Sequence, residues 1–339
     1  MTYAISLDPA RIYCALPAPA YFRREFERVG ARPPKIRIRY RQTDNPPHDV
    51  LIERRGDGFT IVLEQSSARL FTRFMRHKVC AYTYWLSLCA PAVTGITVNA
   101  SDGEEVSRAR FSPSVRFPQH VALPDPHFFQ NLGFARARDA GRQAPDWHGR
   151  SDEIVWRGGM NGTGWMSLEP QDADNPAVLQ RIRMVFRLKG LDGVDARLMD
   201  MHRSVAPFTA LADAQGLLAA PLPATTWLGH KFAIDIDGYT NTWSNLLVRL
   251  LYGCCVLKVG SQFGYRQWYY DALRPFEHYV PVAADMSDFA EKIDWVRSHP
   301  AEAAAIAARG QALAQTLTFA REARRAADLI EAHWDRTEV

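Results

Sequence analysis

The pattern of apolar and polar residues changes once along the chain and divides it into two halves. In the first half, alternating positions and short apolar runs predict strands. These are expected at residues 35–41, at 50–65 as a hairpin turning at Asp57-Gly58, at 95–105 leading into an acidic turn, and at 120–125. Residues 66–88 have the apolar spacing of a helix, with Ser67 as a candidate N-cap. The polar stretch 138–153 then predicts a linker.

The second half alternates strands with helices, which is typical of a parallel, doubly wound sheet. The expected strands are 153–157, 193–198, 231–236, 254–259 and 278–282. The expected helices are 175–189, 241–252, 265–272 and 286–299, followed by an Ala- and Arg-rich helical stretch at 301–334. The predicted fold class is therefore α/β, and a length of 339 residues favours two domains.

Composition adds the picture of a globular chain with a weak positive charge. Apolar residues make up 47% of the chain and charged residues 23%, and the net charge is +4. This charge is far below that of a histone-like chain, so we expect no nucleic-acid partner. It suits an anionic small ligand or a weak attraction to an anionic membrane surface.

The N-terminus, the absence of long apolar windows and the cysteines indicate the cellular compartment of the protein. The N-terminus has no continuous apolar segment of the signal-peptide kind, and no window reaches the roughly 18 apolar residues of a membrane-spanning helix. The five cysteines lack C-x-x-C or zinc-ligand spacing, and their odd number favours a reducing compartment. We therefore expect a cytoplasmic protein.

The stretch EIVWRGGMNGTGW, residues 153–165, joins an apolar strand to Arg157 and to a loop with four glycines in seven residues. Glycine loops after strands let backbone N–H groups approach a phosphate, and a guanidinium binds diphosphate oxygens in pairs. The loop matches neither the dinucleotide nor the ATP fingerprint. Phosphate binding and an ordinary tight turn are both compatible with it.

A second polar loop follows the strand at 231–236, where Asp237-Gly238 precedes a helix expected to start near Thr242. Such a helix start can face an anion. Two acid-x-acid triplets, at 172–174 and 235–237, resemble triplets that hold a divalent cation in some enzymes. The first lies at a helix start and the second at a strand end, so we interpret both as structural and expect no metal site.

Asp102 lies just past a strand of the first half, in the stretch VNASDGEEVSRARFSPS at 98–114. A single aspartate there is ordinarily a turn residue, but a carboxylate that faces a cleft can act as a general base. Asp125, which also follows a short strand, is the alternative base. Its proline-flanked setting favours a rigid turn instead.

Three strings together resemble a known family: WRGGMNGTG, KFAIDIDGYTNTWSNLLVRLLYGCCVLKV, and LRPFEHYVPVAADMSDFAEKIDWVRSHPAEAAAIAARGQALA. The chain is similar to glycosyltransferase family 90, which includes protein O-glucosyltransferases of the Rumi type, capsule xylosyltransferases and lipopolysaccharide enzymes of the LpsA type. The resemblance covers roughly residues 95–320 and is strongest over 231–315. The first 90 residues do not match.

The resemblance implies a GT-B architecture, with two Rossmann-like domains facing across a cleft. It implies an acceptor-side domain at 1–140, a UDP-sugar-binding domain at 150–317 and a C-terminal helix at 318–339. It further implies transfer with inversion, no metal and no cofactor, since the UDP-sugar is a substrate. By the same resemblance Asp102 is the general base. The implied donor-binding residues are Arg157, Gly158, Gly159, Thr163, Gly238, Asn241, Thr242, Trp243 and Ser244.

One departure from the family concerns Ser244, which stands where relatives often carry an arginine that touches the diphosphate. Either Asn241, Ser244 and backbone amides suffice, or Lys258 or Arg266 reaches in.

The expected acceptor is a surface-glycan intermediate of the lipopolysaccharide-core or capsule type, used at the inner membrane face with peripheral membrane association. A protein O-glycosyltransferase and a non-catalytic nucleotide-sugar-binding protein are the alternatives. The missing G-x-G-x-x-G motif argues against a dehydrogenase.

Overall fold

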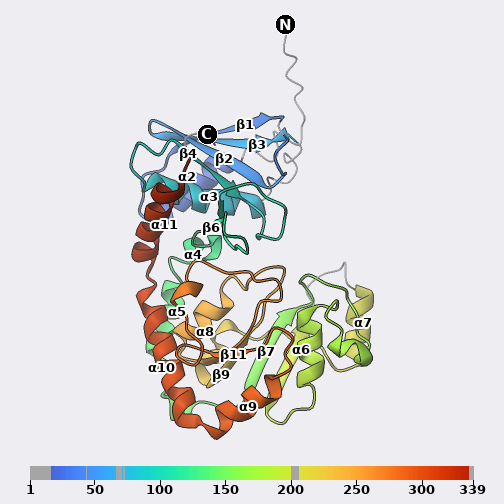
Figure 1. The fold of residues 1–339 in the computed structure, drawn as a ribbon. Helices are drawn as coiled ribbons and strands as arrows, with labels where there is room; N and C mark the ends of the chain where they lie inside the picture. The colour runs from blue at the N-terminus through green and yellow to red at the C-terminus, as the bar shows by residue number, and fades with distance from the viewer. Residues whose placement is uncertain (1–16, 43, 66–70, 72, 200–205, 336–339) are drawn as a thin grey trace. The chain divides into compact units, whose positions relative to one another are not determined.

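The structure, a computed structural model, describes residues 17–42, 44–65, 71, 73–199 and 206–335 (Figure 1). The chain forms two compact units. The N-terminal unit runs to Gly133 and includes the chain again from Phe319, whereas the C-terminal unit comprises Phe134–Thr318. The candidate N-cap Ser67 lies outside the described residues.

The N-terminal unit is a mixed sheet with helices packed on it. Its elements are α2 (Ala18–Arg28), β1 (Lys35–Arg41), β2 (Asp49–Arg55), β3 (Gly58–Glu64), α3 (Arg73–Ser87), β4 (Gly95–Asn99), β5 (Phe111–Ser112), β6 (Val121–Ala122), α4 (Pro126–Gln130) and α11 (Phe319–His333). The strand order is β1-β3-β2-β4-β5-β6, in which β2 is antiparallel to both neighbours and the other pairs are parallel. Apolar side chains of α2, α3 and α11 share one core with the sheet.

The predicted hairpin is confirmed as β2 and β3. Its turn lies at Gly56-Asp57, one residue earlier than expected, because Gly56 supplies the left-handed φ of 59° and Gly58 already pairs with Arg55. Gly58 also has to be glycine, since a Cβ there would lie 2.8 Å from the carbonyl oxygen of Lys35 on β1.

The C-terminal unit is the doubly wound half. Its elements are α5 (Ala135–Arg142), η2 (Trp147–Gly149), β7 (Ile154–Gly159), η3 (Pro170–Asp174), α6 (Gln180–Leu188), β8 (Val194–Met199), α7 (Ala206–Ala214), η5 (Ala224–Gly229), β9 (Phe232–Asp235), α8 (Asn245–Leu251), β10 (Cys255–Val259), η6 (Tyr270–Ala272), β11 (Val280–Val282), α9 (Phe289–Ser298) and α10 (Pro300–Thr316). The strand order is β11-β10-β9-β7-β8, and every pair is parallel.

The α/β class and the parallel sheet of the second half are therefore confirmed. Read from β8, the order is second, first, third, fourth and fifth strand of the unit, which is the flavodoxin-like form of the doubly wound sheet. In that form the chain changes its winding direction between the first and third strands, here β7 and β9. Apolar runs form the strands because both faces of the sheet are covered.

Two expected elements are wrong. The stretch 138–153, expected as a linker, begins inside α5, where Arg138 is buried and donates to the carbonyls of Ala314 and Leu317 at 3.0 and 2.9 Å. The stretch 265–272 is not a helix and has only the short turn η6, although its buried residues Tyr265, Trp268 and Tyr269 recur at helical spacing.

The long C-terminal helical stretch is divided in two. α10 ends at Thr316 and α11 begins at Phe319, so the two helices belong to different units. The carbonyls that Arg138 holds lie at this break, and Leu317 is outside helical geometry with a ψ of 58°. A buried guanidinium thus fixes the end of α10.

Candidate functional site

The carboxyl ends of β7 and β9 define the site in the C-terminal unit. These strands are neighbours, and they are the pair at which the winding direction reverses. Loops that leave such a pair diverge, so a crevice opens between them, and ligands of doubly wound sheets bind there. The glycine-rich loop follows β7 and the Asp237-Gly238 loop follows β9.

These two loops, far apart in sequence, approach each other closely. A Cβ at Gly162 would lie 3.2 Å from the carbonyl oxygen of Gly238, and one at Gly238 would lie 3.1 Å from a guanidinium nitrogen of Arg181. The pocket between them is lined by Asn161, Gly162, Thr163, Gln180, Arg181, Asp237, Gly238, Tyr239, Gln262, Phe263 and Tyr265. Thr163 and Gly238, both expected from the sequence, therefore line one pocket.

Arg181 is the cation of this pocket, and the sequence analysis missed it. It lies in the first turn of α6, and its guanidinium contacts the side-chain oxygen of Asn161 and donates to the carbonyl of Asp237 at 2.8 Å. Burial lowers the pKa of Arg181 to about 10, so it stays charged at neutral pH. Its place in the sequence could have identified it, because α6 is the α-helix that follows the glycine-rich loop.

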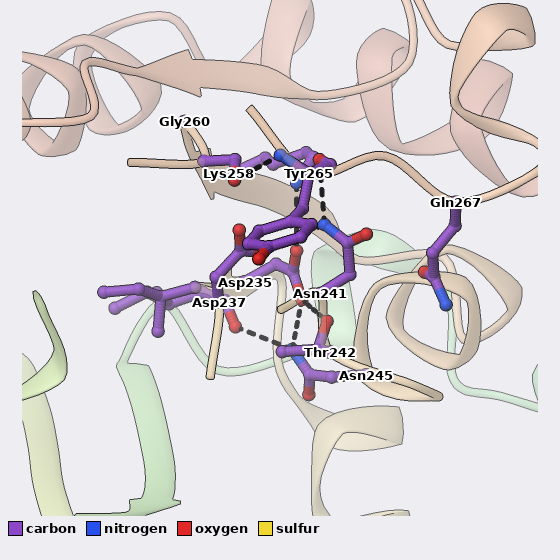
Figure 2. A network of polar contacts seen from close by, with 12 residues as sticks. Asp235, Asp237, Asn241, Thr242, Asn245, Lys258, Gly260, Tyr265 and Gln267 are labelled. Carbon is purple, nitrogen blue, oxygen red and sulfur yellow. Dashed lines mark hydrogen bonds and ion pairs between the residues drawn. The ribbon is translucent and has the colours of Figure 1, made fainter. Parts of the chain in front are cut away.

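Behind the pocket, Asp235 is fully buried and neutralised by protein groups (Figure 2). Its Oδ1 accepts from the hydroxyl of Thr242 at 2.5 Å and from the amide of Asn245 at 2.9 Å. Its Oδ2 lies 3.3 Å from Nζ of Lys258 on β10. Asp235 is thus a buried anchor for the loop and for Lys258.

Asp237, two residues further on, lies nearer the pocket. Its Oδ1 accepts from the amide of Asn241 at 3.3 Å, and Asn241 also donates to the carbonyl of Tyr265 at 3.0 Å (Figure 2). Burial raises the pKa of Asp237, and Lys258 and Ser261 oppose that rise. Asn241 is itself buried, so it supports the loop from the interior of the unit.

The helix expected to start near Thr242 begins three residues later, as α8 at Asn245, and it has only seven residues. The side chains of Thr242 and Asn245 turn toward Asp235 because this buried carboxylate needs donors. Ser244 is the N-cap residue without a side-chain cap bond, and the carbonyl of Trp243 accepts from Gln267 at 3.5 Å.

Arg157 lies on the other side of β7 from this pocket's lining. Its guanidinium pairs with Asp195 of β8 and donates to the carbonyls of Trp156 and Asp195 at 2.9 and 2.8 Å. Its Nε donates to the carbonyl of Ala220 at 3.3 Å. These contacts tie β7 to β8, and Arg157 is not among the residues that line the pocket.

The two glycines after Arg157 support the loop rather than line the pocket. The ring of Trp156 lies 2.3 Å from where a Cβ of Gly158 would be, so this position excludes a side chain. The carbonyl of Gly159 accepts from Arg181 at 3.4 Å. Two other cations are candidate partners of the diphosphate. Arg266 is exposed and pairs with Asp271, whereas Lys258 lies in the buried network around Asp235.

Both acid-x-acid triplets are engaged by other protein groups. Asp172 accepts from the hydroxyl of Ser167 at 2.5 Å, and Asp174 pairs with Arg187 at the same distance. Asp235 and Asp237 belong to the network around Lys258 described above. Within the described ranges, no group of three or more His, Cys, Asp or Glu side chains is arranged to hold a metal ion.

In the N-terminal unit, Asp102 lies on a rigid turn after β4. The Ser101 N–H donates to the Asn99 side chain at 2.8 Å, and the Gly103 N–H donates to the Ser101 hydroxyl at 2.9 Å. Gly103 has a φ of 105°, and a Cβ there would lie 2.7 Å from the carbonyl of Ser114, so only glycine fits. The turn therefore fixes the backbone on both sides of Asp102.

The Asp102 carboxylate is partly exposed, with 16% of its side chain accessible, and it contacts Nζ of Lys78. A pocket of about 160 Å³ is lined by the residues that follow Asp102, Gly103 and Glu104, and Asp102 itself is not among the lining residues. The pocket lining comprises Asn99, Gly103, Glu104, Glu105, Val106, Ser107, Ser112, Ser114, Val115, Arg116, Phe117, Gln119 and His120. The backbone of Asp102 is thus fixed, and its carboxylate is paired with Lys78 and partly accessible.

Asp125 is fully buried, and it caps α4. Its Oδ1 accepts from the backbone N–H groups of His127 and Phe128 at 2.7 and 2.9 Å. Burial raises its pKa to about 7, although these two hydrogen bonds lower it. A buried cap residue stabilises the fold and is not positioned to take a proton from a substrate.

We expect Asp125→Ala to lower the free energy of unfolding by about 1–2 kcal/mol, the usual effect of losing an N-cap. The folded-state pKa, about 7, lies above the ordinary value, so the carboxyl stabilises the fold most at low pH and loses this effect as pH rises through 7. The difference between the two proteins, measured by denaturant unfolding, should shrink from pH 5.5 to pH 8. A difference that grows over that range would contradict the assignment.

No helix in the described part of the chain has both the length and the apolarity needed to cross a membrane. The four cysteines that the structure describes, Cys80, Cys89, Cys254 and Cys255, are buried free thiols.

Comparison with known families gives a match to the model described as Glycosyl transferase family 90, over residues 189–321. The chain is 29% identical over 226 residues to protein O-glucosyltransferase 2 of Danio rerio, which is 58% of this chain and 44% of the relative. It is 34% identical over 88 residues to human protein O-glucosyltransferase 3, which is 26% of this chain and 17% of the relative. The chain thus spans less than half the length of these curated relatives.

Among solved structures, a glycosyltransferase from Rickettsia africae ESF-5 aligns with 99% of this chain and 84% of its own, at 8% identity and a TM-score of 0.41. The family-model match over 189–321 confirms the family resemblance read from the sequence, and it contains β8, β9, β10 and β11.

Proposed function

We propose, from the match of residues 189–321 to the glycosyltransferase family 90 model, that the chain is an inverting, metal-independent enzyme that transfers a sugar from a UDP-sugar to a hydroxyl group. The observation that carries this proposal is the pocket at the carboxyl ends of β7 and β9. There, one half-buried arginine, Arg181, lies between a glycine-rich loop and the loop that follows β9.

The diphosphate of the donor binds in this proposal against Arg181 and the glycine-rich loop. A guanidinium offers paired donors to phosphate oxygens, and backbone N–H groups can approach because the loop has little side-chain bulk. Tyr239, Phe263 and Tyr265 line the same pocket and offer aromatic surface to the rest of the nucleotide. Arg181 would then supply the charge that Ser244 does not.

The reaction is a single displacement. Asp102 takes the proton of an acceptor hydroxyl, whose oxygen attacks the anomeric carbon, and UDP leaves with the electron pair of the broken bond. Arg181 stabilises the charge that develops on the leaving diphosphate, which is the task that a metal performs in other transferases. Lys258 already neutralises Asp235, so this triplet has no vacant carboxylate pair for a cation.

The acceptor is a surface-glycan intermediate of the lipopolysaccharide-core or capsule type, reached by peripheral association with the inner membrane face. The net charge of +4 supports attraction to an anionic surface. A protein acceptor is the second candidate, because the named relatives are protein O-glucosyltransferases.

We expect UDP to stabilise the protein against heat in the presence of EDTA. At a UDP concentration about 100 times its dissociation constant, the free energy of unfolding should rise by about 2.7 kcal/mol. A thermal-shift series with UDP, GDP and NAD, each with and without EDTA, measures this. A shift with GDP or NAD and none with UDP would overturn the donor, and a shift that vanishes in EDTA would overturn metal independence.

A further inference from the structure

Lys78 is a lysine with 1% of its surface exposed, in the middle of helix α3. The residues that follow it, Val79, Cys80, Ala81 and Tyr82, are all core residues. Lysine is almost never fully buried unless its charge is paired, because an unpaired ammonium is very unfavourable in an apolar environment. The position therefore calls for a specific partner.

That partner is Asp102. Nζ of Lys78 contacts Oδ1 of Asp102, and it also lies 3.9 Å from the centroid of the Phe74 ring one turn earlier on α3. The two charged groups differ in accessibility, since the lysine is closed off from solvent and 16% of the aspartate side chain is accessible. The ion pair thus joins a fixed buried cation to a carboxylate that a ligand can reach.

We propose that Lys78 is a positioning residue for the transfer reaction, holding the Asp102 carboxylate in place for the acceptor hydroxyl. The proposal rests on the proposed function, in which Asp102 is the base. The turn through Ser101 and Gly103 fixes the backbone of Asp102, but only a contact to the carboxylate fixes its side-chain torsions. Lys78 supplies that contact from a rigid helix.

Lys78 also interacts with other charged groups near Asp102. Glu104 lies close enough to act on both residues, and burial raises its pKa. His127 of α4 also interacts electrostatically with both members of the pair, and burial lowers its pKa. Lys78 therefore offsets two neighbouring carboxylates, and removing it would leave Asp102 and Glu104 repelling each other.

A double-mutant cycle on release of UDP from a UDP-sugar tests the proposal. UDP-glucose is the probe, with water as acceptor where no other is known. We expect Lys78→Met to lower kcat by about tenfold to a hundredfold, the effect of a small misplacement of a reacting group. In the Asp102→Asn background the same change should have no further effect, because there is no carboxylate left to position. Affinity for UDP should stay within twofold, since the donor pocket lies in the other unit.

The matched control is Arg54→Met. Arg54 is a partly buried cation of the same N-terminal unit, and it donates to the carbonyls of Leu86, Cys89 and Ala90. We expect it to lower thermal stability while leaving kcat of the folded enzyme near wild type. Lys78→Gln, which keeps a hydrogen-bond donor, should lose less activity than Lys78→Met and provides the same cycle if the methionine variant does not fold.

Equal losses from the Lys78 substitution with and without the Asp102 carboxylate would overturn the positioning role. A wild-type enzyme that consumes no UDP-sugar, or an Asp102→Asn variant as active as wild type, would instead show that the proposed function has failed. The two failures are therefore distinguishable.

Discussion

Asp102→Asn should lower the rate of sugar transfer by about two to four orders of magnitude, the range that general-base catalysis contributes. Asparagine keeps the shape of the side chain but cannot accept a proton from the acceptor. The rigid turn between Asn99 and Gly103 is built from backbone and neighbouring side chains, so it survives the change. Steady-state kinetics at saturating donor, with UDP affinity measured separately, would show the loss in kcat alone.

The comparison with Asp125 makes this result interpretable. Asp125→Ala removes the cap of α4 and should cost stability, while the folded fraction keeps its kcat. Asp102→Asn should do the reverse, with an unfolding midpoint close to wild type. An active Asp102→Asn protein together with a folded but inactive Asp125→Ala protein would reverse the assignment of the base.

The parallel sheet of the C-terminal unit could be predicted because its strands are apolar runs separated by helical stretches. Residues such as Cys255, Val256 and Leu257 are buried on both faces, and this burial is visible in sequence as uninterrupted apolarity. The order of the strands could not be read in this way. It depends on β9 returning to the far side of β7, and no local pattern records that step.

Short elements and breaks were missed for a different reason. α5 is polar in composition, with the sequence ARARDAGR, and its helical state depends on tertiary contacts of Arg138 and on Gly141 packing against the carbonyl of Leu251. The break between α10 and α11 lies in a sequence with good helix formers, and the same Arg138 fixes it. Tertiary contacts override weak local propensity in both cases.

At the candidate site, the sequence analysis identified both loops that line the pocket but could not show the direction of the side chains. Arg157 directly precedes the glycines, and its pairing with Asp195 depends on the register between β7 and β8. Arg181 is 24 positions further along the chain, and it reaches the pocket only because α6 begins beside the glycine-rich loop. Lys78 is hidden for a similar reason, since one lysine in a helical stretch gives no sign that it is buried.

Substitutions can distinguish the roles of Arg181 and Arg157 in UDP binding. We expect Arg181→Ala to weaken UDP binding by about tenfold to a hundredfold, because a hydrogen bond to a charged group contributes about 1.5–3 kcal/mol and the variant loses the only arginine that lines this pocket in the described structure. Transfer should also slow, since the leaving diphosphate loses its counter-charge. Arg181→Lys should restore binding in part, because an ammonium keeps the charge but not the paired geometry.

Arg157→Ala is the matched variant, because it removes the same side chain from the strand that leads into the same loop. The carboxylate of Asp195 would lose its main partner, and β7 would lose its side-chain tie to β8, so stability should fall. Isothermal titration with UDP at a temperature where both variants are folded measures the difference directly. Wild-type UDP affinity in Arg181→Ala, with affinity lost in a folded Arg157→Ala protein, would instead assign diphosphate binding to Arg157, the donor-binding arginine that the family resemblance implies.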